Sequence, residues 1–236
     1  MKRKRIFKGK LVFEGEYLNG KRNGKGKEFC FDGELIFEGE YLNGKRNGKG
    51  KEFCFDGDLL YEGEYLDGKR NGKGKEFCYN NELIYEGEFI NGEKNGKGKE
   101  YDKIIFEGEY LNGKRNGRGK EYNEEGELLF EGEYLNGKKW NGKGYDKMGN
   151  IDFEIKNGKG YIKEYDYNGK LKFKGEYLNG EKNGKGREYY YDGKLEYEGE
   201  YLNGKRNGKE KEYYDDSNLK FEWGILNGKE YYDIVD

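Results

Sequence analysis

The sequence contains no proline, histidine, alanine, threonine or glutamine, and its only serine is Ser217. Without alanine, and with 42 glycines, long helices are not expected, because each helical glycine costs about 1 kcal/mol relative to alanine. Without histidine, Ser-His and Cys-His nucleophilic systems are excluded. The absences therefore favour strands and turns, and they predict a chain that is not an enzyme and carries no cofactor.

Long apolar runs are missing as well. No stretch approaches the roughly 18 apolar residues of a membrane-spanning helix, and the N-terminus lacks the apolar segment of a secretory signal. We therefore expect a cytoplasmic protein. The 46 basic residues almost balance 48 acidic ones, for a net charge of -2, so nucleic acid is not an expected partner, because it requires a basic excess on one face.

The chain has three cysteines, Cys30, Cys54 and Cys78, at equal spacing. This spacing excludes the close cysteine pairs of zinc sites, and no metal site is expected. Two strands per repeat at about 4.8 Å each would place equivalent residues ~9.6 Å apart, beyond the ~7 Å limit for a disulfide. We expect free thiols in a reducing compartment.

What the sequence does contain is a repeat. The segment 13–36 recurs at 37–60 with changes only at Asp58 and Leu60, and the two starts are 24 residues apart, the difference between 37 and 13. Eight well-formed copies are present, and they open at Phe13, Phe37, Tyr61, Tyr85, Phe106, Phe130, Phe173 and Tyr197.

The copies and their irregularities divide the chain into three parts. Residues 1–12 are a basic N-terminal segment with a half-repeat cap. Residues 13–220 are the array of repeats, irregular at 140–172, where Trp140 is inserted and one copy is truncated. Residues 221–236 are a degenerate C-terminal cap, as expected where a stacked array stops.

Within one copy, Phe13, Gly15 and Tyr17 alternate with polar or aliphatic residues, which is the spacing of a strand. Asn-Gly pairs at 19–20 and 23–24 predict one hairpin per repeat, and Asp32-Gly33 predicts the turn into the next copy. The predicted register has a four-residue loop at 19–22. It sets Leu18 opposite Asn23, Tyr17 opposite Gly24, Glu16 opposite Lys25, Gly15 opposite Gly26 and Glu14 opposite Lys27. Rings would then cover glycines on one face, while Glu and Lys pair on the other.

Phe13-Glu-Gly-Glu-Tyr17, followed by Asn19-Gly-Lys-Arg-Asn-Gly-Lys-Gly26, resembles the MORN repeat. The resemblance covers about residues 13–228 and implies an all-β fold: hairpins side by side in an elongated, twisted, single-layer antiparallel sheet with a groove. The sequence of residues 189–195 is similar to a bacterial variant of this repeat that is classed as an antitoxin component. Proteins with this repeat serve mostly as scaffolds, so the resemblance implies binding of a partner protein or peptide, or self-association as a homodimer.

A single-layer sheet has one face that no second layer covers, and exposed aromatic surface usually marks a partner site. The fifth position of each copy supplies such a row, which either lines a protein-binding groove or only fills the face. The row consists of Tyr17, Tyr41, Tyr65, Phe89, Tyr110, Tyr134, Tyr177 and Tyr201.

The alternative function is peripheral binding to anionic membranes, including phosphoinositides, through basic loops. A further alternative is antitoxin-like neutralisation of a toxin. The candidate lipid-contact residues are Lys21, Arg22, Lys45, Arg46, Lys69, Arg70, Lys114 and Arg115.

Three other patterns are weaker. Gly15 to Lys21 has the spacing of a phosphate-binding loop, but Arg22 stands where that loop needs a hydroxyl. Glu14 and Glu16 recur in identical settings opposite lysines, which favours a solvated salt-bridge face over an acid-base pair. The basic run 2–5 is expected to be a solvated tail, with a nuclear address or a lipid anchor as the functional alternatives.

Overall fold

The computed structural model describes residues 1–102, 105–166, 168–226 and 229–231, with side chains up to Lys220. These residues form β-strands and one 3₁₀ turn, and consecutive strands pair antiparallel in one open sheet, which confirms the predicted all-β class. The elements are β1 (Lys2–Phe7), β2 (Lys10–Leu18), β3 (Lys21–Phe29), β4 (Leu35–Leu42), β5 (Lys45–Phe53), β6 (Leu59–Leu66), β7 (Lys69–Phe77), η1 (Tyr79–Asn81), β8 (Leu83–Ile90), β9 (Glu93–Glu100), β10 (Ile105–Leu111), β11 (Lys114–Tyr122), β12 (Leu128–Leu135), β13 (Lys138–Tyr145), β14 (Ile151–Lys156), β15 (Lys159–Tyr165), β16 (Leu171–Leu178), β17 (Glu181–Tyr189), β18 (Leu195–Leu202), β19 (Lys205–Tyr213), β20 (Leu219–Leu226) and β21 (Lys229–Tyr231).

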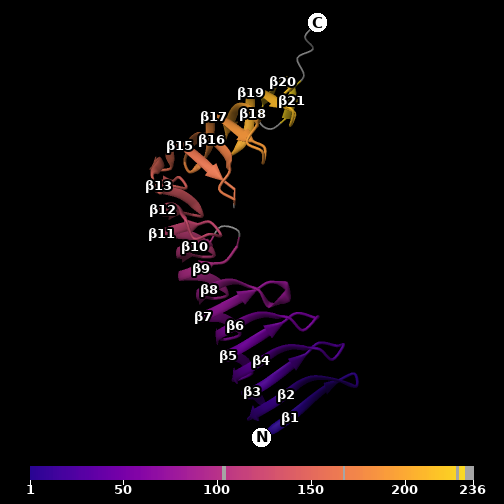
Figure 1. The fold of residues 1–236 in the computed structure, drawn as a ribbon. Helices are drawn as coiled ribbons and strands as arrows, with labels where there is room; N and C mark the ends of the chain where they lie inside the picture. The colour runs from indigo at the N-terminus through magenta and orange to yellow at the C-terminus, as the bar shows by residue number, and fades with distance from the viewer. Residues whose placement is uncertain (103–104, 167, 227–228, 232–236) are drawn as a thin grey trace. The chain divides into compact units, whose positions relative to one another are not determined.

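The chain divides into two compact units. The first comprises Met1–Asp102 and Glu109–Lys114, and the second comprises Lys103–Gly108 and Arg115–Asp236. In the first unit, strands β1 to β9 follow one another in chain order, and the turns that join them alternate between two edges of the sheet (Figure 1). The basic run 2–5, expected as a solvated tail, forms strand β1, in which Lys4 pairs with Glu14 of β2.

The Asn19-Gly20 turn differs from the predicted four-residue loop. Leu18 pairs with Lys21 and Tyr17 with Arg22, so the loop has two residues. Both loop residues have positive φ, 49° and 77°, as a type I′ turn requires. Further from the turn the prediction is confirmed, because Gly15 pairs with Gly26 and Glu14 with Lys27.

A β-bulge at Gly24 explains how a two-residue loop is compatible with the predicted pairing of Gly15 and Glu14 further from the turn. Its glycine, Gly24, has φ 95° and faces Tyr41 of the following repeat rather than Tyr17. A Cβ at this position would lie 2.1 Å from the Glu16 carboxylate, which folds over the bulge. In the next copy the equivalent Glu40 accepts a hydrogen bond from the Lys49 backbone N–H at 2.9 Å. The predicted register was wrong here because it did not include the bulge that the glutamate side chain covers.

The turns that join successive repeats form as predicted at Asp32-Gly33. The Cys30 N–H donates to the Glu34 carbonyl at 2.9 Å, and the Gly33 N–H donates to the Cys30 carbonyl at 3.1 Å. On the opposite edge the turns stack on one another, because the Gly44 N–H donates to the Arg22 carbonyl of the preceding repeat at 2.8 Å. Each repeat is thus tied to its neighbour along the strands and at the turn tip.

The core lies on one face of the sheet. The aromatic residue that opens each of the eight copies is fully buried, from Phe13 to Tyr197. Seven of these rings lie over a glycine pair, and a Cβ on Gly26 would come within 2.4 Å of the Phe13 ring. Tyr197 lies over Gly199, which pairs with Glu210. The Tyr41 ring meets Phe13 edge to face at 5.2 Å, a favourable aromatic geometry. Paired glycines therefore make the room that the rings occupy.

The irregular region 140–172 keeps the strand pairing with shorter strands. Trp140 lies in β13, and its carbonyl accepts a hydrogen bond from the Gly158 N–H at 2.8 Å. Phe153 of β14 stacks on Phe130 with an interplanar angle of 19°, instead of the edge-to-face contact seen elsewhere. The truncated copy thus changes the ring packing and leaves the sheet continuous.

Candidate functional site

The aromatic row predicted to line a groove is inside the molecule. Six of its eight rings are at most 4% exposed, and only Tyr17 and Tyr177 are half-buried. The buried members are Tyr41, Tyr65, Phe89, Tyr110, Tyr134 and Tyr201. These rings fill the core face, which agrees with the filling alternative, and a partner cannot reach them without opening the core.

A row of cations covers the rings and replaces the missing second layer. The Arg46 guanidinium lies 3.9 Å from the centre of the Phe37 ring. Its nitrogens donate to Glu28 at 2.8 Å and to Glu52 at 3.0 Å. Equivalent cations lie over the opening ring of the other copies, at 3.8 to 4.7 Å. Alternating glutamates and cations therefore form a ladder above the core.

This ladder divides the candidate lipid-contact residues into two groups. The arginines, Arg22, Arg46, Arg70 and Arg115, are half-buried in ion pairs with glutamates. The lysines, Lys21, Lys45, Lys69 and Lys114, are exposed at the turns. Of these eight residues, only the four lysines are available to a membrane. The predicted lipid-contact surface therefore presents half of its predicted positive charge.

The ladder changes the acidity of its members. Burial works to raise the pKa of Glu28, but the hydrogen bond and charge of Arg46 outweigh it and hold this pKa below the ordinary value. Burial, together with the charge of Glu28, raises the pKa of Tyr41, whose hydroxyl donates to Glu28 at 2.9 Å. At neutral pH the glutamate is charged and the tyrosine is neutral.

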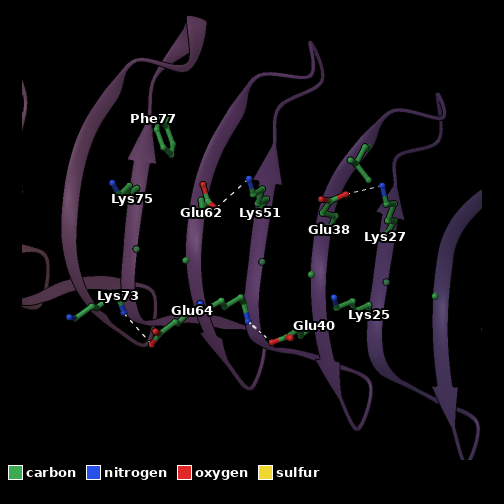
Figure 2. A pocket seen from close by; sticks show the side chains of 18 of the residues that line it. Lys25, Lys27, Glu38, Glu40, Lys51, Glu62, Glu64, Lys73, Lys75 and Phe77 are labelled. Carbon is green, nitrogen blue, oxygen red and sulfur yellow. Dashed lines mark hydrogen bonds and ion pairs between the residues drawn. The ribbon is translucent and has the colours of Figure 1, made fainter.

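The opposite face of the first unit carries the groove. It has a volume of about 1680 Å³ and spans the strands from β1 to β9. Its floor is the backbone of glycine pairs such as Gly26 with Gly39 and Gly50 with Gly63. Two rows of charged side chains flank the floor (Figure 2). The open surface thus lies on the face where Glu and Lys, not rings, were predicted.

The predicted Glu-Lys pairing on this face is confirmed in part: Glu14 lies opposite Lys27 as predicted, whereas Glu16 folds over the Gly24 bulge and Lys25 lies opposite Glu40. Lys27 contacts Glu38 at 2.8 Å, and the same pair recurs between Lys51 and Glu62 at 3.3 Å, as the dashed lines in Figure 2 show. The lining contains eight lysines and eight glutamates, so its formal charge is zero. The groove therefore presents both signs of charge at every repeat.

Apolar side chains border the groove beyond one charged row. Phe29 pairs with Leu35, and two repeats further on Phe77 pairs with Leu83. All four line the groove and are half-buried. A bound segment could place apolar side chains there while its charged groups meet the walls.

Other chemistries find no support among the described residues. No group of three or more His, Cys, Asp or Glu side chains in this part of the chain could hold a metal ion. Cys30, Cys54 and Cys78 are free thiols. No helix within the described ranges is long and apolar enough to cross a membrane.

Sequence reasoning identified the charged face but assigned the groove to the wrong side. The useful signal was the alternation of each strand, which places both glutamates of a copy on the face opposite the rings. Because neighbouring residues of a strand point to opposite faces, Gly15 gives its Cβ side to the ring of Phe13 and leaves bare backbone between Glu14 and Glu16. The glycine is required by the ring, whereas the trough follows from the alternation of the strand.

A comparison with protein-family models gives a match to the model described as MORN repeat. The matched residues are 13–34, 37–59, 61–82, 85–103, 106–126, 173–194 and 197–218. The copy opening at Phe130 is not among them, although β12 and β13 form the corresponding hairpin. No curated protein matches the chain.

Proposed function

The chain belongs to the MORN repeat family, whose repeats are generally associated with protein or membrane binding, and we propose that it is a non-catalytic scaffold. Its first unit would hold a segment of a partner protein in the glycine-floored groove. Neutralisation of a toxin would be one instance of this mode of binding.

The charge balance of the groove carries the proposal. A polyanion such as nucleic acid would meet a glutamate beside every lysine, so it would lose the electrostatic gain on which its binding depends. A polypeptide can present both signs of charge and match the alternating walls. Complementary charge patterns of this kind mainly give specificity and orientation.

The groove can exchange its own contacts for those of a partner. Lys51 and Glu62 are about half exposed, at 43% and 48%, and exposed ion pairs contribute only about 0–1 kcal/mol each. Breaking them to bind a partner therefore costs little. The floor between the two charged rows is backbone, because the residues between the glutamates point to the core face, and Phe29 and Phe77 offer apolar contacts, where binding energy is usually concentrated.

A protein partner is favoured over an anionic membrane by the disposition of the basic residues. Arg22, Arg46 and Arg70 are engaged in the core ladder. Of the remaining turn lysines, Lys45 pairs with Asp67 at 3.4 Å. The attraction of about 1 kcal/mol per basic residue near a charged surface is correspondingly reduced.

The test is affinity capture by the tagged full chain in its native cells, with amine-reactive cross-linking. The groove variant removes two whole ion pairs, Lys51→Ser with Glu62→Ser and Lys75→Ser with Glu86→Ser, so its net charge is unchanged. The control variant removes two pairs at the turns, Lys10→Ser with Asp32→Ser and Lys45→Ser with Asp67→Ser.

We expect a partner that binds the wild type and the control, is lost from the groove variant, and cross-links to Lys49 or Lys73 of the groove wall. Equal capture by both variants, or cross-links confined to residues outside the groove, would overturn the proposal. Circular dichroism of both variants checks that the sheet is intact.

A further inference from the structure

The two turn edges of the first unit carry different, regularly repeated side chains. The leucine-lysine edge, where the Asn-Gly and Asp-Gly turns stack, displays one exposed leucine and one exposed lysine in each of three repeats. Its residues are Leu18 with Lys21, Leu42 with Lys45, and Leu66 with Lys69. The leucines are 49% to 59% exposed. The next turn on this edge carries Ile90 and Glu93 in their place, so three lysines against Asp67 and Glu93 give these four turns a net charge of +1.

The opposite edge is acidic and aromatic. This aromatic-acidic edge consists of the repeat-joining turns, with Phe31, Phe55 and Tyr79 at 56%, 70% and 73% exposure. Its acidic residues are Asp32, Glu34, Asp56, Asp58 and Glu82. Two basic residues belong to it as well: Lys8 is exposed in the turn between β1 and β2, and Lys10 lies 3.7 Å from Asp32. Five acids and two lysines give a net charge of -3.

Because consecutive strands are antiparallel and in chain order, both edges advance by the same two strands per repeat, about 9.6 Å at ordinary strand spacing. An array of equal pitch can therefore meet this one at every repeat, lysine against acid and leucine against aromatic ring. A second copy of the chain supplies such an array.

We propose that copies of the chain associate side by side, with the leucine-lysine edge of one molecule against the aromatic-acidic edge of the next. The contact uses the edges and leaves the groove open, so it is independent of the proposed partner binding. Each contact is small, and the repeats add their contributions because engaging one repeat raises the local concentration of the others.

The geometry of this contact determines how assembly proceeds. The two surfaces differ, so the interface is heterologous, and each bound molecule still presents a vacant edge of each kind. Interfaces of this type continue into open assemblies unless the rotation closes a ring. Mass should therefore rise steadily with protein concentration, and fall with added salt, which screens exposed charges.

The test is sedimentation velocity of the full chain over a concentration series, with two charge-reversed variants. The lysine-reversed variant carries Lys21→Glu, Lys45→Glu and Lys69→Glu. The acid-reversed variant carries Asp32→Lys, Glu34→Lys and Asp56→Lys. We expect the wild type to associate, each variant alone to associate at least about tenfold more weakly, and a mixture of the two variants to recover association, because their edges are complementary again.

A wild type that stays monomeric, a mass that stops at the dimer, or a mixture no more associated than its components would each overturn the proposal. Should a reversed variant fail to fold, the neutral set Lys21→Gln, Lys45→Gln and Lys69→Gln replaces it, with weaker association than the wild type as the expected result. Association unchanged by any edge variant would place the contact elsewhere on the chain and contradict the inference.

Discussion

Replacing Arg46 with methionine tests whether the cation ladder holds the core closed. Arg46 is 23% exposed, lies over Phe37, and donates to Glu28 and Glu52, which are 17% and 22% exposed. Methionine keeps much of the apolar contact with the ring and removes the charge. The substitution therefore isolates the two charged hydrogen bonds and the cation-π contact.

The expected cost follows from the interactions that the guanidinium makes. Hydrogen bonds to charged groups contribute about 1.5–3 kcal/mol each, and a partly buried cation-π contact contributes about 1 kcal/mol. Glu28 keeps Arg22 at 2.6 Å, and Glu52 keeps Arg70, so neither carboxylate is left without a cation. Because neither carboxylate becomes an unpaired buried charge, only part of these contributions is lost. We therefore expect the Arg46→Met change to lower the free energy of unfolding by about 2–3 kcal/mol.

Urea denaturation followed by circular dichroism measures this loss, and two controls bracket it. Lys45→Met removes the neighbouring exposed cation and should cost less than about 0.5 kcal/mol. Arg46→Lys should fall between, because Lys94 occupies the equivalent position and reaches its two glutamates at 3.5 and 3.6 Å. Equal stability of the Arg46→Met and Lys45→Met variants would refute the role of the ladder.

Three further predictions concern pH, the glycine floor and a turn. Because the pKa values of Glu28, Glu121 and Glu188 are lowered in the folded chain, their stabilisation is present above the ordinary carboxyl pKa and lost as pH falls through the lowered values. The urea midpoint should therefore decline below about pH 4.5, and Arg46→Met should make this decline smaller, because without the guanidinium the pKa of Glu28 lies nearer its ordinary value and less stabilisation is left to lose. The Gly50→Ala substitution places a Cβ 2.5 Å from the Phe37 ring and should cost about 3 kcal/mol, whereas Gly57→Asn at an open turn with φ 85° should leave the midpoint nearly unchanged. The Asp58→Glu substitution should cost about 1 kcal/mol and speed hydrogen exchange at Asn80. The reason is that the Asp58 carboxylate accepts from the Asn80 backbone N–H at 3.0 Å and from the Asn81 side-chain amide at 3.2 Å. Unchanged exchange at Asn80 would contradict that role.

Much of the fold could be predicted from the sequence because the same residue pattern recurs in every copy of the repeat. The alternation of Phe13, Gly15 and Tyr17 specified a strand, and Asn19-Gly20 specified the hairpin. The outer register followed from matching Glu14 with Lys27 and Gly15 with Gly26. These features depend on residues close in the chain or directly across a hairpin.

Which face of the sheet is open to a partner could not be predicted in the same way. Whether Tyr41 is covered depends on Arg22 and Glu28 of the preceding repeat and on Arg46 of its own. The sequence pattern places these residues in a loop and a charged run, and it does not show that they fold over the rings. The bulge at Gly24 was missed for a similar reason, since the Glu16 side chain that caps it comes from the opposite strand.

The central claim, that rings form a closed face and the charged trough is the open one, is tested most directly by tyrosine acylation of the folded chain with N-acetylimidazole, mapped by mass spectrometry. Tyr79 and Tyr191, at 73% and 77% exposure, should react readily. Tyr41 and Tyr65, each 4% exposed and with pKa values raised by burial and by Glu28 and Glu52, should stay unmodified until urea unfolds the chain. Modification of Tyr41 and Tyr65 in the folded protein at the rate of Tyr79 would contradict the account.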